Sequence, residues 1–469
     1  MRTTILALIA VVLLAIIIIG YVPFLTTAGD DAAYVPDDAL LVVSFRSVND
    51  LRKAMSGFGP NNADPATELI GKKINVPGLD GADFERPIYL WVSKDREEHA
   101  LVPVVDRSAF QDAFDRSREN LHMRDPEWIG RNYAYLSPTR DTPSARNPSR
   151  RALQMRDYPV SAYQNLSDVN LFRQFLGFPF AANPGRRIPT PVARIIVDQC
   201  ADLLVGLSDE KPRGAVARID LWATLRPDAL SRAPTVAMKL DPARLARALP
   251  PQSQLFLAAA LDAAGWKSLG LPVDFGDAAI AFASVRTTSI KRPHAFALAV
   301  QPRDTSKLDP DPLLKILLGS AAQTEPTVTE DEGTSIRTWT LDAPPPLLAP
   351  LVKKRVQSAA PPVRVSVTTE RGVLLLAVGS SAPSVVQVQL AGLRGEATPT
   401  VAETKQVSAH PGFNAPGHVA IGMITERGLR ALGDGLPTFL PAAIGQPEAA
   451  TFVVDVKDGE ARATVLLSR

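Results

Sequence analysis

Residues 34–55 have the sequence Tyr34-Val-Pro-Asp-Asp-Ala-Leu-Leu-Val-Val-Ser-Phe-Arg-Ser-Val-Asn-Asp-Leu-Arg-Lys-Ala-Met55. The apolar and β-branched run from Ala39 to Phe45 predicts a strand, and the Pro-Asp-Asp tripeptide before it predicts a turn. Ser47 stands where a helix N-cap is expected, with Asp50 in the first turn of an amphipathic pattern. The stretch therefore predicts a strand, a cap and a short helix, in that order.

The same unit returns along the chain, at 158–176, 250–269 and 417–429. Other predicted elements recur in the same order. The strands at 87–92 and 100–105 match those at 278–285 and 295–300, the helix at 106–114 matches 311–318, and the strand at 132–139 matches 372–381. Recurrence of this kind indicates a duplicated chain, so we expect two related halves.

We expect an α+β fold in which each half is a curved antiparallel sheet with helices packed on one face, after an N-terminal transmembrane helix. The chain has 469 residues, which is enough for several domains. The expected boundaries are a membrane anchor at 1–29, a first half at 34–228, a connector at 229–249 and a second half at 250–469.

An insertion at 322–365 interrupts the correspondence between the halves, because nothing before Tyr133 matches it. Strands such as 255–261 carry apolar residues on both faces, and each face must be covered. We therefore expect a groove between the halves, bordered by the insertion, with Leu347 and Leu351 as candidate partner-binding residues. A fully packed interface is the alternative.

Three further segments carry local signals. Residues 190–204 predict a helix with Thr190 as cap, in which the single cysteine, Cys200, is a buried thiol. Residues 215–225 alternate as a strand does. The runs 450–456 and 460–467 predict a hairpin around the Asp-Gly turn at 458–459.

The N-terminal segment is apolar. Residues 3–29 carry no charge, and 5–25 is about as long as the roughly 20 residues that a membrane-spanning helix needs. Arg2 precedes this run and Asp30 and Asp31 follow it, which favours a cytoplasmic N-terminus and an extracytoplasmic body. A cleavable signal peptide ending near Ala28 is the alternative, but we expect the segment to be retained. Either outcome places the body in the periplasm or at the cell surface.

The sequence lacks the local motifs of common active sites. It has no Gly-rich phosphate loop, no Gly-x-Ser-x-Gly and no His-Glu-x-x-His. Ser208-Asp-Glu-Lys211 fits Ser-x-x-Lys, but no Lys-Thr-Gly follows it, so an ordinary loop is favoured. His410 and His418 are the closest histidines, and a metal there would need carboxylates from elsewhere. We predict no catalytic residue, no cofactor and no metal.

Positive charge gathers after Tyr135, where a single acid, Asp141, accompanies several arginines. The candidate partner-binding residues in this patch are Arg140, Arg146, Arg150 and Arg151. Such a patch suits anionic lipid, polysaccharide or an acidic partner, whereas the alternative is a solvated loop and helix face. Because the formal net charge is only +2, and because the chain is expected to be exported, we expect no nucleic-acid partner.

The recurring Pro-containing strand with its capped helix, and the later Gly372-Val-Leu-Leu-Leu-Ala-Val-Gly-Ser-Ser381 strand, carry a family resemblance. Over most of residues 34–469 the chain resembles a bacterial family of exported proteins of unknown function, with duplicated strand–helix units. The resemblance implies a fold and a location outside the cytoplasm. It implies no catalytic residues.

These features predict a membrane-tethered extracytoplasmic binding or scaffold protein of the cell envelope, with a protein partner or an apolar ligand. The membrane is its other expected partner, through the N-terminal helix. The alternative is an envelope hydrolase with dispersed catalytic residues. A cleft with perturbed Asp, Glu or His groups would favour the hydrolase, whereas a wide apolar groove would favour a binding protein.

Overall fold

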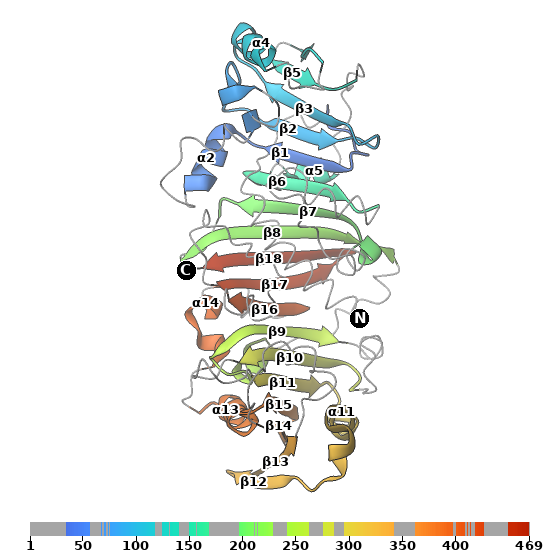
Figure 1. Cartoon of the computed structure of the whole chain (residues 1–469), viewed down its shortest axis with the longest axis vertical. Helices are drawn as coiled ribbons and strands as arrows, with labels where there is room; N and C mark the ends of the chain where they lie inside the picture. Colours follow the sequence, from blue (N-terminus) through green and yellow to red (C-terminus); the bar gives the residue numbers. More distant parts are fainter. Residues whose placement is uncertain are drawn as a thin grey trace.

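The fold is seen in a computed structural model of the chain. It describes residues 34–56, 67, 70–71, 74, 76–117, 124–130, 132–139, 150–155, 157–167, 197–210, 212, 214–227, 242–261, 275–285, 295–341, 362–396, 400–408, 410, 413, 418–425 and 449–468. Its strands form one antiparallel sheet of 18 strands, so the molecule is long and narrow (Figure 1).

Both halves of the chain contribute strands to this sheet. The first half contains β1 (Leu41–Phe45), β2 (Ile88–Val92), β3 (Glu98–Pro103), β4 (Glu127–Ile129), β5 (Tyr133–Leu136), β6 (Val160–Asn165), β7 (Cys200–Ser208) and β8 (Ala215–Leu225). The second contains β9 (Ser253–Leu261), β10 (Ala278–Val285), β11 (Ala295–Pro302), β12 (Thr327–Asp331), β13 (Thr334–Leu341), β14 (Val363–Glu370), β15 (Val373–Gly379), β16 (Ala420–Thr425), β17 (Ala449–Lys457) and β18 (Glu460–Ser468).

The pairing of strands gives one unbroken order. From one end to the other it is β4, β5, β3, β2, β1, β6, β7, β8, β18, β17, β16, β9, β10, β11, β15, β14, β13, β12. The strand order of one half corresponds to that of the other, with β1, β2 and β3 in the places of β9, β10 and β11. The halves meet antiparallel, β8 against β18.

The predicted fold class is wrong, because the chain is mostly β and the halves do not have a sheet each. Asp220 of β8 lies opposite Thr464 of β18, and the pairing runs along the whole of both strands. The physical reason is that an edge strand leaves a row of unpaired backbone groups. Joining the two long edge strands satisfies those groups and makes one sheet from two.

The insertion lies at one end of the sheet. Its described strands, β12 and β13, extend the sheet beyond β14 and have no counterpart in the first half. They are far from the β8–β18 pair, so this part of 322–365 does not border a groove between the halves as predicted. Leu347 and Leu351 lie outside the described residues.

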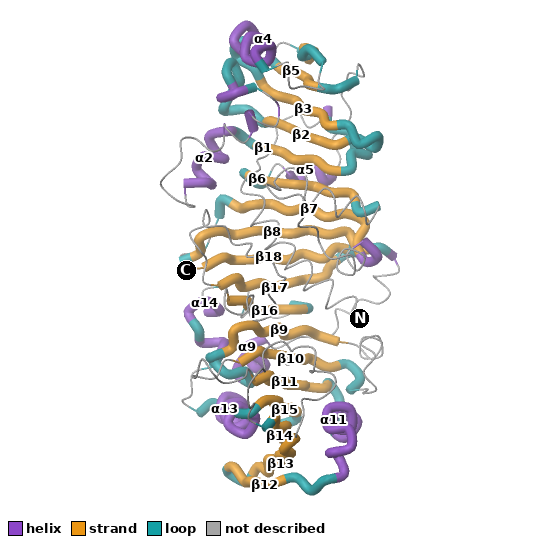
Figure 2. Tube along the Cα trace, in the orientation of Figure 1, coloured by secondary structure: helices purple, strands orange, loops and turns teal. Residues whose placement is uncertain are grey.

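Helices pack on both faces of the sheet, which corrects the expectation of one covered face (Figure 2). The helices are α2 (Val48–Ser56), α4 (Arg107–Arg116), α5 (Arg150–Met155), α9 (Pro242–Arg247), α11 (Asp311–Leu318), α13 (Ala382–Arg394) and α14 (Lys405–Ser408), with short 3₁₀ turns at Pro77–Leu79, Thr305–Lys307, Gly319–Gln323 and Val401–Glu403.

Successive side chains of a strand point to opposite faces of the sheet, so each half has an apolar core on both faces. Val43 of β1 packs with Leu51 of α2 and Phe110 of α4, whereas the adjacent Val42 packs with Met155 of α5 on the opposite face. The second half repeats this arrangement, with α9, α13 and α14 over one face and α11 over the other. Both faces of these strands are therefore buried.

The predicted Ser47 cap is confirmed, because the Ser47 Oγ accepts a hydrogen bond from the Asp50 N–H at 2.9 Å. The predicted helix at 106–114 is present as α4, and the structure adds a cap to it: the Asp106 Oδ1 accepts a hydrogen bond from the Ala109 N–H at 3.0 Å. The predicted strand at 215–225 and the hairpin around Asp458 are also present. These features depend on neighbouring residues, so local sequence is sufficient to specify them.

The predicted helix at 190–204 is wrong from Cys200 on, although residues 197–199 just before it are helical. Cys200–Ser208 is strand β7, bonded to β6 on one side and β8 on the other. Pairing on both edges overrides the helical pattern. Cys200 is nonetheless buried as expected, and burial raises the pKa of its thiol to about 12.

In the ranges described above, no helix has the length and apolar character needed to cross a membrane. The predicted anchor at 1–29 lies outside those ranges and stays a prediction.

Candidate functional site

Charged and aromatic side chains gather on one face of the sheet where the two halves meet. We call this group the junction network. It consists of Arg151, Tyr158, Asp202, Arg218, Asp220, Trp222, Thr224, Glu460, Arg462 and Thr464. The alternation of β8 and β18 points these strand residues to one face, while apolar residues such as Ile219 and Val465 point to the other.

Arg151 is the centre of the network. Its side chain comes from α5 in the first half, and the residue is only 7% exposed. The guanidinium donates to Asp202 Oδ1 at 2.7 Å and lies 3.4 Å from Glu460 Oε1 of β18. Asp202 Oδ2 also accepts a hydrogen bond from the Thr224 hydroxyl at 3.0 Å. One arginine therefore links a helix of the first half to the last strand of the second.

An aromatic stack continues the network across the junction. The Arg462 guanidinium lies 4.1 Å from the centre of the Trp222 ring, and it also contacts Glu460 at 3.3 Å. The Trp222 Nε1–H donates to the Tyr158 hydroxyl at 2.7 Å. Burial is the main cause that raises the pKa of Tyr158 to about 12, so its hydroxyl stays protonated.

The buried aspartate of β8 is bonded from both halves. Asp220 Oδ1 accepts from the Thr464 hydroxyl at 3.0 Å and from Arg218 Nε at 3.1 Å. The buried Asp220 carboxylate therefore has a hydrogen-bond donor from each half, as burial requires. These contacts fix the register in which β8 of the first half pairs with β18 of the second.

Two histidines lie next to this network. His418 Nδ1 is 2.6 Å from Asp455 Oδ1, and His410 Nε2 is 3.4 Å from the Thr464 carbonyl oxygen. Burial lowers the pKa of His410 to about 4, so the ring is neutral at pH 7. Both side chains are buried, in agreement with hydrogen-bonded histidines. Within the described ranges, no group of three or more His, Cys, Asp or Glu side chains is arranged to hold a metal ion.

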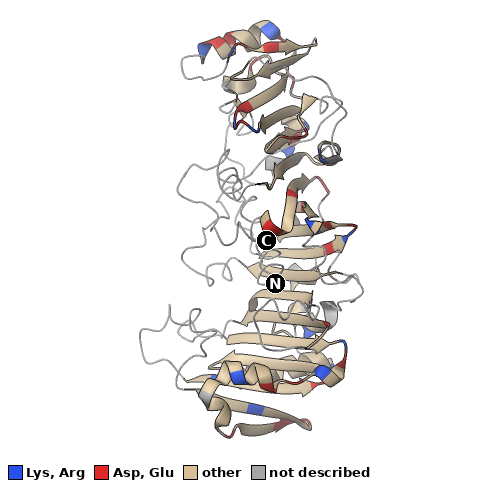
Figure 3. Cartoon of the chain, turned by 90° about the vertical axis from the view of Figure 1, so that its right-hand side faces the viewer, with Lys and Arg blue, Asp and Glu red and all other residues tan. Residues whose placement is uncertain are grey.

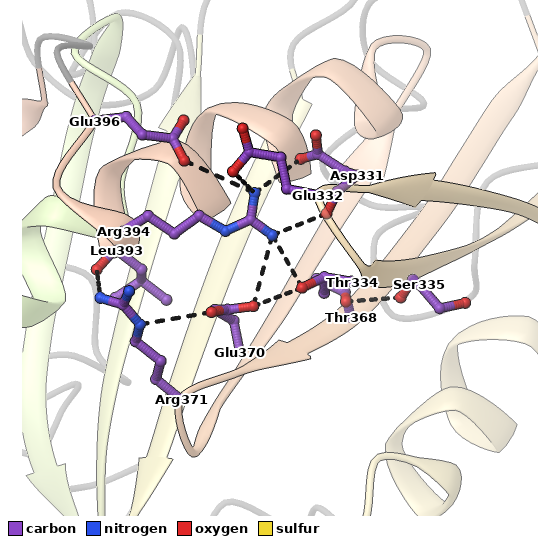
Figure 4. Close-up of polar contacts among 10 residues, drawn as sticks. All are labelled: Asp331, Glu332, Thr334, Ser335, Thr368, Glu370, Arg371, Leu393, Arg394 and Glu396. Atoms are coloured by element: carbon purple, nitrogen blue, oxygen red, sulfur yellow. Dashed lines mark hydrogen bonds and ion pairs between the residues drawn. The ribbon is translucent and has the colours of Figure 1, made fainter.

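A second charged cluster lies near the β12 end of the sheet (Figure 4). Arg394, the last residue of α13, is surrounded by four carboxylates, those of Asp331, Glu332, Glu370 and Glu396, at 3.2 to 3.8 Å. Its guanidinium also donates to the Asp331 carbonyl and to the Thr334 hydroxyl, both at 2.9 Å. This arginine thus fastens the β12–β13 hairpin to the helix.

The predicted site residues are not brought together in the described ranges. Arg151 is inside the junction network, and its charge is bound by Asp202 and Glu460. Arg150 begins α5, but its side chain lies outside the described part, as do Arg140 and Arg146. Their role in binding a partner stays a prediction. Figure 3 shows acidic and basic residues interspersed over the molecule, with long parts of the strands free of either.

Sequence reasoning missed most of the junction network. It used only the apolar positions of 215–225, although Arg218, Asp220 and Trp222 alternate with them. The same alternation places Glu460, Arg462 and Thr464 together in the last strand. Polar and charged residues on one face of two long strands are the signal that could have found the network.

No protein-family model, curated protein or solved structure matches this chain. The resemblance to a family of exported proteins therefore stays a prediction.

Proposed function

We propose that this protein is a membrane-tethered scaffold of the cell envelope, whose long extracytoplasmic body binds a protein partner and carries out no reaction. The observation that carries the proposal is the continuity of the 18-stranded sheet. At about 4.8 Å per strand, a sheet of this size extends roughly 80 Å. Such a body can present a binding surface far from its tether.

The position of the first described residues supports this geometry. Tyr34 and Val35 pack with Val42 and Tyr89, so the body begins beside β1 and β2. The β12 end lies most of the sheet's length away (Figure 1). An anchor formed by the apolar segment at 1–29 would then leave the β12 end distant from the membrane.

The junction network also supports a structural role. A hydrolase needs a carboxyl or imidazole group that reaches its substrate. Here Asp202, Asp220 and Glu460 accept hydrogen bonds or ion pairs from neighbouring side chains. Their charges stabilise the contact between the halves, which is what a stiff scaffold requires.

Fractionation of cells that produce the tagged full chain tests the proposal. We expect the protein in the membrane fraction after a high-salt wash, with its body digested by protease added outside spheroplasts. Replacing residues 1–29 with a cleavable signal peptide should release the body in soluble form. If the body resisted protease added outside spheroplasts and was digested only after lysis, the proposal would be contradicted. Catalytic turnover of ester, peptide or glycoside substrates by the purified chain would also contradict it.

A further inference from the structure

The two ends of the sheet differ in how they are protected. At one end, β4 is only 3 residues long, and the Arg107 guanidinium covers its Trp128 ring at 4.5 Å while donating to the Gly130 carbonyl oxygen at 2.9 Å. At the other end, β12 has 5 residues, of which Thr327 to Glu330 are exposed. Val328 is 54% exposed, unusually high for a large apolar residue in a strand.

Within the ranges that the structure describes, the backbone groups on the outer edge of β12 have no strand partner. Among the described residues, β12 pairs with β13 alone, so the donors and acceptors on its other side face away from the sheet. An exposed edge of this kind is a template on which another extended chain can form a strand. Proteins usually shorten, cover or charge such edges, and in the part of the chain that the structure describes this edge is protected by charge alone.

The charge on this edge is negative. Glu330, Asp331 and Glu332 lie within the hairpin and Glu325 lies just before it, whereas Arg337 of β13, opposite Val328, is the only Lys or Arg in residues 327–341. Arg394 is buried among four carboxylates and does not neutralise them all. The Glu330 carboxylate has no hydrogen bond or ion pair with any described residue, and Glu330 is exposed.

Self-association through β12 is opposed by this charge. If two copies paired antiparallel about Thr329, their Glu330 side chains would occupy diagonal positions on one face, about 7–8 Å apart. Like charges at this separation, added to the other acids of each hairpin, disfavour a symmetric dimer. A positively charged strand would instead meet complementary charge.

We propose that β12 is the docking edge for an extended, lysine- or arginine-rich segment of a protein partner, which adds to the sheet as a further antiparallel strand. Backbone hydrogen bonds supply the affinity, and Glu330 selects positive side chains on one face, next to an apolar contact with Val328. This inference rests on the proposed function, since it names the surface and the chemistry of the partner that such a scaffold binds.

The test uses the purified full chain and a fluorescent peptide of Lys-Thr-Val-Thr repeats, which as a strand places lysine and valine in turn on one face. We expect saturable binding in fluorescence anisotropy, which Glu330→Lys weakens at least tenfold. Asp112→Lys, a matched charge reversal on exposed α4 at the other end of the molecule, should leave the affinity unchanged. A peptide with the same side chains but every backbone amide N-methylated should lose binding, because strand addition requires those donors.

Equal binding of the methylated peptide would overturn the inference, since charge alone would then explain the affinity. Equal binding to the Glu330→Lys variant would also overturn it. Thermal unfolding of each variant checks that it is folded. If the peptide does not bind, while the membrane-tethered chain still crosslinks reproducibly to one envelope protein through another surface, this inference fails and the proposed function stands.

Discussion

Arg151 and Glu460 form an ion pair that is buried and that joins the two halves of the chain. Removing one partner of such a pair costs about 3–5 kcal/mol, because it leaves the other charge buried and uncompensated. Arg151 also binds Asp202, so its removal leaves two carboxylates without their cation. At the scale of the single residue, this is where we expect stability to be most sensitive to charge.

We expect Arg151→Met to destabilise the protein by about 3–5 kcal/mol and Glu460→Gln by less, as measured by urea unfolding. The double variant should be less destabilised than the sum of the two, because both changes remove one interaction. Arg116→Met is the control, since its ion pair with Asp80 is exposed and should contribute less than about 1 kcal/mol. Additive effects of the two junction variants would contradict a direct pair.

His410 makes stability depend on pH. Burial lowers the pKa of its ring from 6.5 to about 4, so protons bind the unfolded chain more readily than the folded one. Its contribution is fully present above about pH 6.5, decreases as the pH falls from 6.5 to 4, and is lost below. The difference corresponds to about 3 kcal/mol. Urea midpoints across this range should fall less steeply for His410→Asn than for the wild type; parallel curves would exclude His410 as the cause.

At the scale of the element, the β12–β13 hairpin lies at the end of the sheet, and its outer strand, β12, is exposed. It pairs with β14 along one side only, and Arg394 fastens its turn to the end of α13. Exposed strands with few buried apolar contacts open more easily than core strands. The hairpin should therefore respond to changes that leave the core intact.

We expect Arg394→Met to speed amide hydrogen exchange in residues 327–341 while leaving β10 and β11 protected. Two hydrogen bonds, to the Asp331 carbonyl and the Thr334 hydroxyl, would be lost. Arg371→Met is a matched control, because that side chain is exposed and lies beside the same helix end. Uniformly faster exchange in all strands would instead indicate global destabilisation.

At the scale of the whole molecule, the single sheet sets the distance between its ends. Spin labels at Asp112→Cys and Val328→Cys would mark α4 and β12, and the native Cys200 is buried and should not react. We expect a separation above about 60 Å in pulsed electron resonance, given about 4.8 Å per strand. Two halves folded face to face would give a much shorter distance and would contradict the continuous sheet.

The sequence by itself determined the elements whose signals are local. The Ser47 and Asp106 caps, the strand at 215–225 and the Asp458 turn each depend on residues within a few positions of one another. Hydrogen bonds at this separation follow from the identity of the neighbours. The strand content of both halves was predictable for the same reason.

Only the tertiary structure decided how the strands combine. The bond between Asp220 and Thr464 spans 244 positions in the sequence, and no local pattern indicates which edge strand will meet which. Cys200 became part of a strand because β6 and β8 pair on both sides of it. Arg151 is buried and is not part of a surface patch, because Asp202 and Glu460, distant in the chain, form ion pairs with its guanidinium.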